Sequence, residues 1–225
     1  MFFVCHKKLF LVFILIAVLV LPVFVKSPDA ITYASSSYTV VIDAGHGGKD
    51  KGAISEYSGV FESDLNLQFS KVLEKYFKIA GVKVVQTRKD KNALGNGDRF
   101  IKRLDMNARL VAIKKAKPDM VISHHMNKFS EGKNQTGAQV FYQSSDTKSG
   151  KLAEIIQQKL NKEQVKKRSA LGGDFFILRN CKSPAVIIEC GFLSNIQEEK
   201  LLQTKSHQEK VCESIFLGAM EYLLK

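Results

Sequence analysis

Short apolar runs alternate with longer amphipathic stretches along the chain after residue 37. The runs are rich in β-branched residues and predict strands at residues 39–43, 82–87, 120–125, 138–143, 175–178 and 185–189. Between them, apolar residues at helical spacing predict helices at about residues 63–80, 99–116 and 149–164, and two more that divide near residue 205. The alternation predicts an α/β fold, in which a single domain holds a mostly parallel, twisted sheet of about six strands flanked by helices.

The N-terminal part departs from this alternation. Lys7 and Lys8 precede an apolar run that covers residues 9–21 and resumes at 23–25, as in a secretory signal or a signal-anchor. The run is at the lower limit of length for a membrane-spanning helix, so cleavage and retention both remain open. Residues 32–34 form a poor cleavage pattern, which favours an anchor. We expect a signal peptide or signal-anchor at 1–26, a linker at 27–37 and one folded domain at 38–225.

The chain is basic, with 34 Lys and Arg against 22 Asp and Glu, a net charge of +12. Residues 1–34 hold three Lys and one Asp, so the rest keeps 31 − 21 = +10. A solvated lysine-rich surface accounts for this charge, and so does attraction to wall glycan, wall polymer or anionic lipid. The positive-inside tendency of Lys7 and Lys8 places the domain outside the cytoplasm. A nucleic-acid partner is disfavoured, because an exported chain would not meet one and no binding motif is present.

The cysteines exclude a disulfide-dense fold. Cys5 lies in the leader, and the remaining three, Cys181, Cys190 and Cys212, are an odd number without a short-loop framework or zinc-finger spacing. Cys190 falls in an apolar strand and is expected to pack as a small hydrophobic side chain. A bridge between Cys181 and Cys212 stays open.

Several polar residues with catalytic chemistry follow the apolar runs. Residues 40–53 (VVIDAGHGGKDKGA) form a strand that ends in a glycine-rich loop around His46. Glu62 opens a helix, the pair His124 and His125 ends a strand, and Glu189 ends another. Open α/β sheets bind ligands at the carboxyl ends of their strands. Two imidazoles and a carboxylate make a catalytic zinc site with one open position, and a second carboxylate can serve as the base.

The motifs IDAGHGGKDKGA, ESDLNL, TRKD, SHHMN and PAVIIECGFLSN, in this order and spacing, resemble those of the zinc-dependent N-acetylmuramoyl-L-alanine amidases of bacterial cell-wall turnover. The similarity covers nearly the whole chain after residue 37. Within the family, the chain resembles the membrane-anchored, single-domain amidases that trim the spore cortex in spore-forming bacteria. The family often has an Ala-Asn pair in the helix before the Ser-x-His strand, where this chain has Ile113-Lys114.

The resemblance implies which residues bind zinc near the start of the domain. His46 becomes the first ligand. Glu62, directly before the Leu-rich helix, becomes the second in preference to Glu56, which falls in a variable loop. Asp43 either orients the imidazole of His46 as a hydrogen-bond acceptor or caps the strand end.

The resemblance also implies roles for residues in the later strands. The family pattern Ser-x-His-x-Asn fits Ser123, His125 and Asn127, which makes His125 the third zinc ligand. His124 then needs a hydrogen-bond partner that the sequence does not identify. Glu189 corresponds to the catalytic glutamate, which takes a proton from the zinc-bound water and passes it to the leaving amine.

Two basic features stay open. Arg88, at the end of the second strand, could hold a substrate carboxylate or pair with Asp90 or Glu189. The helix at 99–116 carries Arg109 and several other basic residues, for which a solvated face is favoured over contact with a wall polymer.

The activity that the resemblance implies is hydrolysis of the amide between N-acetylmuramic acid and the L-alanine of peptidoglycan stem peptides, with Zn²⁺ as cofactor. It further suggests cortex maturation, in which stem peptides are removed so that muramic lactam can form, with a partner enzyme that closes the ring. The alternatives are a general wall-turnover or cell-separation amidase, a peptidase acting on another stem-peptide bond, and a non-catalytic wall-binding protein on the same fold.

Overall fold

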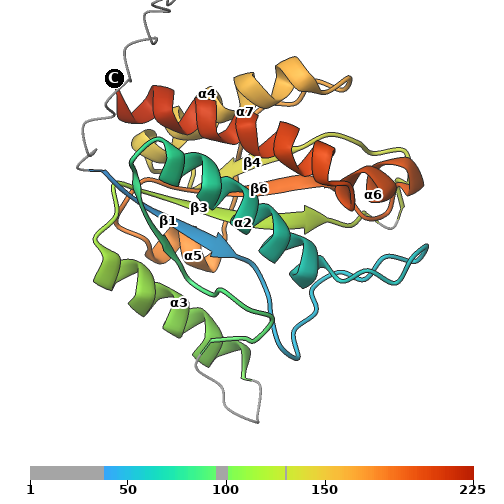
Figure 1. Cartoon of the computed structure of the whole chain (residues 1–225), viewed down its shortest axis with the longest axis horizontal. Coiled ribbons are helices and arrows are strands. Elements are labelled where there is room, and N and C mark those ends of the chain that lie inside the picture. Colours follow the sequence, from blue (N-terminus) through green and yellow to red (C-terminus); the bar gives the residue numbers. More distant parts are fainter. Residues whose placement is uncertain (1–37, 95–100, 130) are drawn as a thin grey trace, which may run out of the picture. The chain divides into compact units, whose positions relative to one another are not determined.

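The computed structural model describes residues 38–94, 101–129 and 131–225. The predicted leader and linker at 1–37, and the predicted helix start at residue 99, lie outside these residues. A six-stranded sheet forms the middle layer, in the order β2-β1-β3-β6-β4-β5 (Figure 1). Its strands are β1 (Thr39–Ala44), β2 (Lys83–Gln86), β3 (Met120–Asn127), β4 (Gln139–Tyr142), β5 (Leu171–Gly172) and β6 (Ala185–Phe192).

The sheet is mostly parallel, as the sequence predicts. Strands β1, β2, β3 and β6 run in one direction, β4 pairs antiparallel with β6, and β5 pairs parallel with β4. The carboxyl ends of β1, β3 and β6 therefore meet at one edge, which we call the carboxyl edge. The amino ends of the same strands form the opposite edge.

Helices cover both faces of the sheet (Figure 1). One face packs against α2 (Glu62–Ile79), α4 (Thr147–Glu163) and α7 (Lys205–Leu223), and the other packs against α3 (Lys102–Ala116) and α5 (Phe176–Asn180). The short helix α6 (Ile196–Leu202) follows β6. Val40 and Ile42 enter the core beneath α2, whereas Val41 enters the core on the α3 side, because successive side chains of a strand point to opposite faces.

One predicted strand is wrong. Residues 175–178 were expected to be a strand, but the short helix α5 begins at Phe176, and Ile177 and Leu178 pack with the core on the α3 side. The fifth strand is instead the two-residue β5. A short apolar run fits a buried strand and a buried helical turn equally well, so periodicity alone cannot separate the two.

Within the residues that the structure describes, no helix is both long and apolar enough to cross a membrane.

Candidate metal centre

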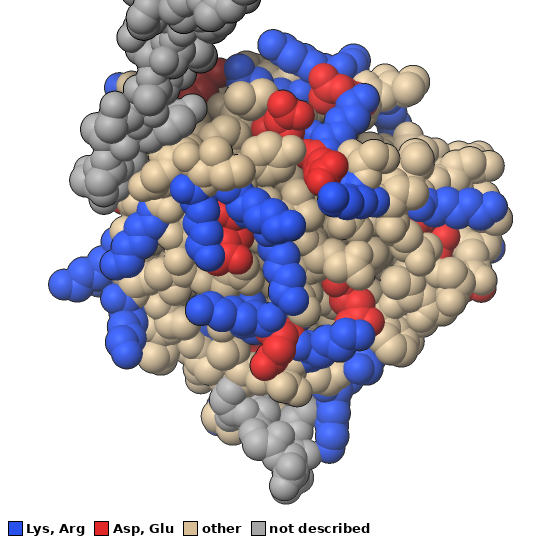
Figure 2. Space-filling view, viewed as in Figure 1, with Lys and Arg blue, Asp and Glu red and all other residues tan. Residues whose placement is uncertain are grey.

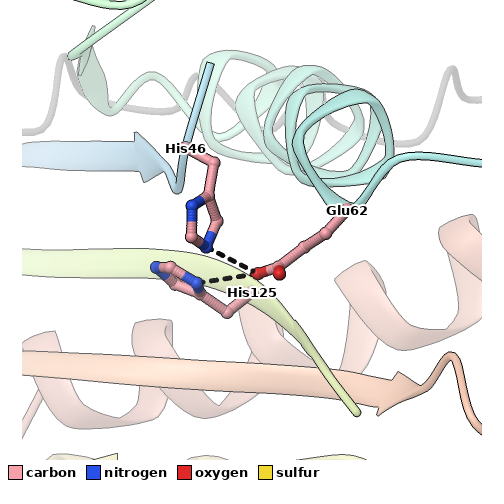
Figure 3. Close-up of side chains that lie close together, drawn as sticks. All are labelled: His46, Glu62 and His125. Atoms are coloured by element: carbon pink, nitrogen blue, oxygen red, sulfur yellow. Dashed lines mark hydrogen bonds and ion pairs between the residues drawn. The ribbon is translucent and has the colours of Figure 1, made fainter. Parts of the chain in front are cut away.

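Three side chains that the sequence singles out as metal ligands meet at the carboxyl edge (Figure 3). His46 follows β1, His125 lies in β3, and Glu62 is the first residue of α2. Oε1 of Glu62 lies 3.2 Å from Nε2 of His46 and 2.9 Å from Nδ1 of His125. One donor atom from each residue lies within 4.8 Å of the other two. Two imidazole nitrogens and a carboxylate oxygen are a donor set that suits catalytic zinc, which keeps a fourth position for water or substrate.

Two glycines allow the three side chains to converge. A Cβ built on Gly45 would lie 2.3 Å from the imidazole of His125, so any side chain there would displace that ring. A Cβ on Gly52 would lie 2.5 Å from Oε2 of Glu62 and 2.7 Å from the ring of His46, and its φ of 65° is itself in the left-handed region. The glycines of the sequence motif thus make room for the candidate ligands.

Backbone and side-chain donors fix the carboxylate of Glu62. Its Oε2 accepts from the amide of Ala53 at 2.7 Å, and its Oε1 accepts from the amide of Met126 at 3.2 Å and from Asn66 at 3.3 Å. Burial alone would raise the pKa of Glu62, but hydrogen bonds and charge from the two histidines outweigh burial and hold the pKa far below its usual value. Glu62 is therefore an anion, as a metal ligand must be.

Asp50 supports the imidazole of His46. Nδ1 of His46 lies 2.8 Å from a carboxylate oxygen of Asp50, which leaves Nε2 to face Glu62 and His125. Burial acts to lower the pKa of His46, but Asp50 and Glu62 raise it to about 9. A carboxylate behind a ligating histidine is a common arrangement at metal sites. It fixes the tautomer in which Nδ1 carries the proton and Nε2 is free to bind the metal. The donor set and its support therefore fit a zinc ion.

Of the two roles left open for Asp43, orienting the imidazole of His46 is not the one that the structure shows. Asp43 instead accepts from Thr87 at 2.6 Å, from Ser123 at 2.7 Å and from Arg109 at 2.7 Å. Burial would raise the pKa of Asp43, but Arg109 and the two hydroxyls hold it well below its ordinary value. Asp43 thus links β1 to β3, to the residue that follows β2 and to α3.

Arg109 is not part of a solvated face, in contrast to the sequence-based expectation for the basic helix. It is only 1% exposed. It pairs with Asp43 and Asp105, and it also donates to the backbone carbonyls of Ala44 and His46, at 2.7 and 2.6 Å. His46 itself has a φ of 62°, a strained value for a residue with a side chain. The spacing of Asp105 and Arg109, four residues apart on one helix face, is the only sequence signal for this network.

Arg88 also has a structural position. Its guanidinium donates to the backbone carbonyls of Ala44, Gly45, Ser63 and Asp90, at 2.7 to 2.9 Å. It is 4% exposed, so it does not present a free donor to a substrate carboxylate. Of the alternatives open from the sequence, only Asp90 is a partner, through its carbonyl. Arg88 joins the glycine-rich loop to the first turn of α2.

His124 lies apart from the candidate ligands. It is fully buried on the α2 face, beside Phe69, and its Nδ1 lies 3.1 Å from the hydroxyl of Ser70. Burial lowers the pKa of His124 to about 3, so the ring is neutral. Ser70 is the hydrogen-bond partner that the sequence does not reveal, because it lies 54 positions away.

Glu189 lies beside the cluster, in β6, directly across the ladder from His125 in β3. Its Oε2 is buried and has no hydrogen-bond partner among the described residues. Burial raises the pKa of Glu189 to about 7, with His125 and His46 opposing that rise and Glu62 adding to it. A carboxyl group of this kind can gain and lose a proton near neutral pH, as a general acid–base requires. Glu56, the alternative to Glu62, is not part of the cluster. It is exposed and pairs with Lys128 and Lys133.

A cavity of about 270 Å³ opens next to the candidate ligands. His46 and His125 line it together with Lys102 and with apolar side chains of α3, α5 and the residue before α5, namely Met106, Phe175 and Phe176. It provides room for a bound molecule beside the metal ligands.

The three described cysteines are free thiols. Cys190 is buried in the core, as expected, and Cys212 is buried as well. The bridge between Cys181 and Cys212, left open by the sequence, is not formed.

Comparisons with known proteins agree with this fold. The family described as N-acetylmuramoyl-L-alanine amidase matches residues 40–221. A germination-specific N-acetylmuramoyl-L-alanine amidase of Bacillus subtilis (strain 168) is 31% identical over 193 residues, which cover 83% of this chain and 80% of that protein. The CwlD amidase of Clostridioides difficile, solved in complex with the GerS lipoprotein, superimposes with a TM-score of 0.76 at 33% identity, covering 83% of this chain and 98% of that chain. An N-acetylmuramoyl-L-alanine amidase from Clostridium difficile 630 gives 0.75 at 34% identity, covering 84% and 97%.

The chain is an α/β domain that carries two histidines, a glutamate and a nearby protonatable carboxyl group at its carboxyl edge. These features place it in the class of hydrolases with a candidate metal site. Within that class, the chain belongs to the N-acetylmuramoyl-L-alanine amidase family.

Proposed function

We propose that this protein is a zinc-dependent amidase that hydrolyses the bond between the lactyl group of N-acetylmuramic acid and the L-alanine of the peptidoglycan stem peptide. The observation that carries the proposal is the convergence of His46, Glu62 and His125 beside the buried carboxyl of Glu189. Membership of the amidase family supports the choice of bond, which the metal donors alone do not make.

His46, Glu62 and His125 would hold the zinc ion. When bound, zinc polarises the scissile carbonyl and lowers the pKa of a water molecule to near neutrality. Glu189 accepts a proton from the attacking water and returns it to the amide nitrogen as the carbon–nitrogen bond breaks. The products are a free lactyl carboxyl group and a stem peptide with a free L-alanine amine.

The setting that we propose is outside the cytoplasm, with residues 1–26 as a signal peptide or signal-anchor, 27–37 as a linker and 38–225 as the catalytic domain. Similarity to a germination-specific amidase supports a role in cortex maturation, in which stem-peptide removal precedes muramic lactam formation by a partner enzyme. The second candidate is a general wall-turnover or cell-separation amidase, because all the motifs described above serve that function equally.

Digestion of purified peptidoglycan tests the activity. The expected products are free muramic acid carboxyl groups together with free N-terminal L-alanine. New ends elsewhere in the stem peptide would indicate a peptidase instead, and an absence of new ends would indicate a non-catalytic wall-binding protein. Heat-denatured protein serves as the control.

Analysis of spores from a deletion strain tests the setting. Cortex maturation predicts spores that lack muramic lactam and fail to complete germination. Normal, germination-competent spores together with chains of unseparated cells would instead identify the cell-separation amidase.

A further inference from the structure

Lysines gather at the edge of the sheet opposite the metal centre. We call this group the basic edge, and it consists of Lys78 at the end of α2, Lys83 at the start of β2, three lysines around the end of α3 and one before β6, namely Lys114, Lys115, Lys117 and Lys182. All six are exposed. Lys and Arg side chains project from this end of the molecule, where β1 begins (Figure 2).

Few acidic groups balance this charge. Lys78 pairs with Glu74, but in the described part of the chain no carboxylate forms an ion pair with the other five lysines. Asp119, next to the end of α3, accepts from the backbone amide of Thr39 at 2.7 Å. Asp146, which precedes α4, caps that helix. These three carboxylates keep their negative charge, so the six lysines leave the basic edge with a surplus of positive charge.

A cavity of about 360 Å³ opens at the same edge, between the end of α3 and the start of β6. Leu110 and Ile113 give it an apolar wall, and Lys114, Lys117 and Lys182 also line it. Two large aliphatic side chains, Ile79 and Leu224, are 75% and 71% exposed at the ends of α2 and α7. Lysines interspersed with exposed aliphatic side chains are typical of surfaces that lie against lipid headgroups.

The chain also enters the domain at this edge. β1 begins at Thr39, and its first residue lies at the amino end of the sheet. The eleven residues of the linker at 27–37 reach at most about 40 Å when fully extended. If the apolar run at 9–25 is an uncleaved signal-anchor, one of the two alternatives given above, the short linker keeps the start of β1 within about 40 Å of the bilayer surface.

We propose that the basic edge binds the anionic phospholipid headgroups of the membrane's outer surface, with the cavity between α3 and β6 receiving a phosphate-bearing headgroup. The metal centre, at the opposite edge, then faces away from the bilayer and towards the wall. The proposal rests on the extracytoplasmic setting proposed above but not on amidase activity, because lipid binding is measured without turnover.

Vesicle binding by residues 38–225 tests the proposal without the apolar segment. This domain should fold on its own, since the described residues form one compact unit and the two solved Clostridioides relatives consist almost entirely of the matched region. We expect it to sediment with phosphatidylcholine vesicles that contain phosphatidylglycerol, not with phosphatidylcholine alone, and to be released by added salt.

Charge reversal locates the binding surface. Because one lysine near an anionic bilayer strengthens binding by roughly fivefold, the triple variant Lys114→Glu, Lys117→Glu, Lys182→Glu should bind at least ~10²-fold more weakly. The matched control reverses three exposed lysines at or near the carboxyl edge, Lys162→Glu, Lys166→Glu and Lys200→Glu, with the same change in net charge. The control should keep most of its binding, and circular dichroism checks the fold of both variants.

Two outcomes would overturn the proposal. One is equal loss of binding in both triple variants, which would indicate attraction by net charge alone. The other is an absence of binding to phosphatidylglycerol vesicles, together with retention on purified wall carrying its anionic polymer, which would indicate that the wall polymer is the partner.

Discussion

At the scale of single residues, Glu189 has the features of a general acid–base. It is the one carboxyl group beside the candidate ligands whose pKa is raised, to about 7, because burial disfavours its charge. Its removal should therefore slow proton transfer without removing a metal ligand.

We predict that Glu189→Gln keeps its zinc but turns over peptidoglycan at least ~10²-fold more slowly. The base acts as a carboxylate, so wild-type kcat/KM should fall as the pH drops through the pKa of Glu189, at or below about 7 because bound zinc would lower that value. The residual activity of the variant should not show this fall of kcat/KM at low pH. Pre-steady-state turnover at several pH values measures the loss of rate and its pH dependence, and metal analysis measures the retained zinc. A fully active variant would disprove the assignment.

The adjacent histidines form a matched pair. His125 points at Glu62, whereas His124 is buried against Ser70 on the other face. We predict that His125→Ala loses zinc, and that His124→Leu keeps it at a cost of about 1 kcal/mol in unfolding free energy, since the Ser70 hydroxyl loses its partner. Metal content after dialysis checks this prediction, and the reverse pattern would exchange the two roles.

At the scale of elements, the buried pairing of α3 with β1 supports the loop that carries His46. Arg109 pairs with Asp43 and Asp105 and donates to the carbonyl of His46. Removal of one partner from a buried ion network leaves uncompensated charge, which costs more than the pairing itself contributes.

We predict that Arg109→Met lowers the unfolding free energy by about 3–5 kcal/mol. It should also weaken zinc binding, because the backbone of His46 loses its anchor. Arg103→Ala, an exposed residue of the same helix, should change stability by less than about 0.5 kcal/mol. Urea denaturation with and without zinc measures both terms, and equal stability of the two variants would contradict this role for Arg109.

The sequence predicts most of the elements, and it places His46 and the pair His124–His125 at the ends of apolar runs, which parallel strands bring together. The choice of His125 over His124, and of Glu62 at the start of a helix over Glu56, comes from the resemblance to the amidase family. The sequence does not predict that Asp50, rather than Asp43, supports His46, since both lie within four residues of it. The burial of Arg109 depends on Asp43, 66 positions away, and only the folded chain shows that contact. The two-residue β5 and the helix α5 are too short for periodicity to identify.

At the scale of the whole molecule, the candidate ligands come from α2, β3 and the loop after β1, so a bound ion would join three separate elements. Metal that binds only the folded state stabilises that state by mass action. The same ion would then serve both catalysis and the integrity of the carboxyl edge.

We predict that chelation abolishes activity and lowers Tm by about 5–10 °C, the shift expected when zinc is present at about 100 times its Kd for a domain of this size. Added zinc should restore both. The His125→Ala variant is the control, since its Tm should not respond to the chelator. An unchanged Tm in the chelated wild-type protein would contradict this coupling.

The most direct test of the central claim is anomalous X-ray scattering, measured at the zinc absorption edge from crystals of residues 38–225 grown with zinc. We predict one strong peak, about 2.0–2.2 Å from Nε2 of His46, from Nδ1 of His125 and from a carboxylate oxygen of Glu62. No peak among these three atoms, or a peak bound by other residues, would contradict the account of this site.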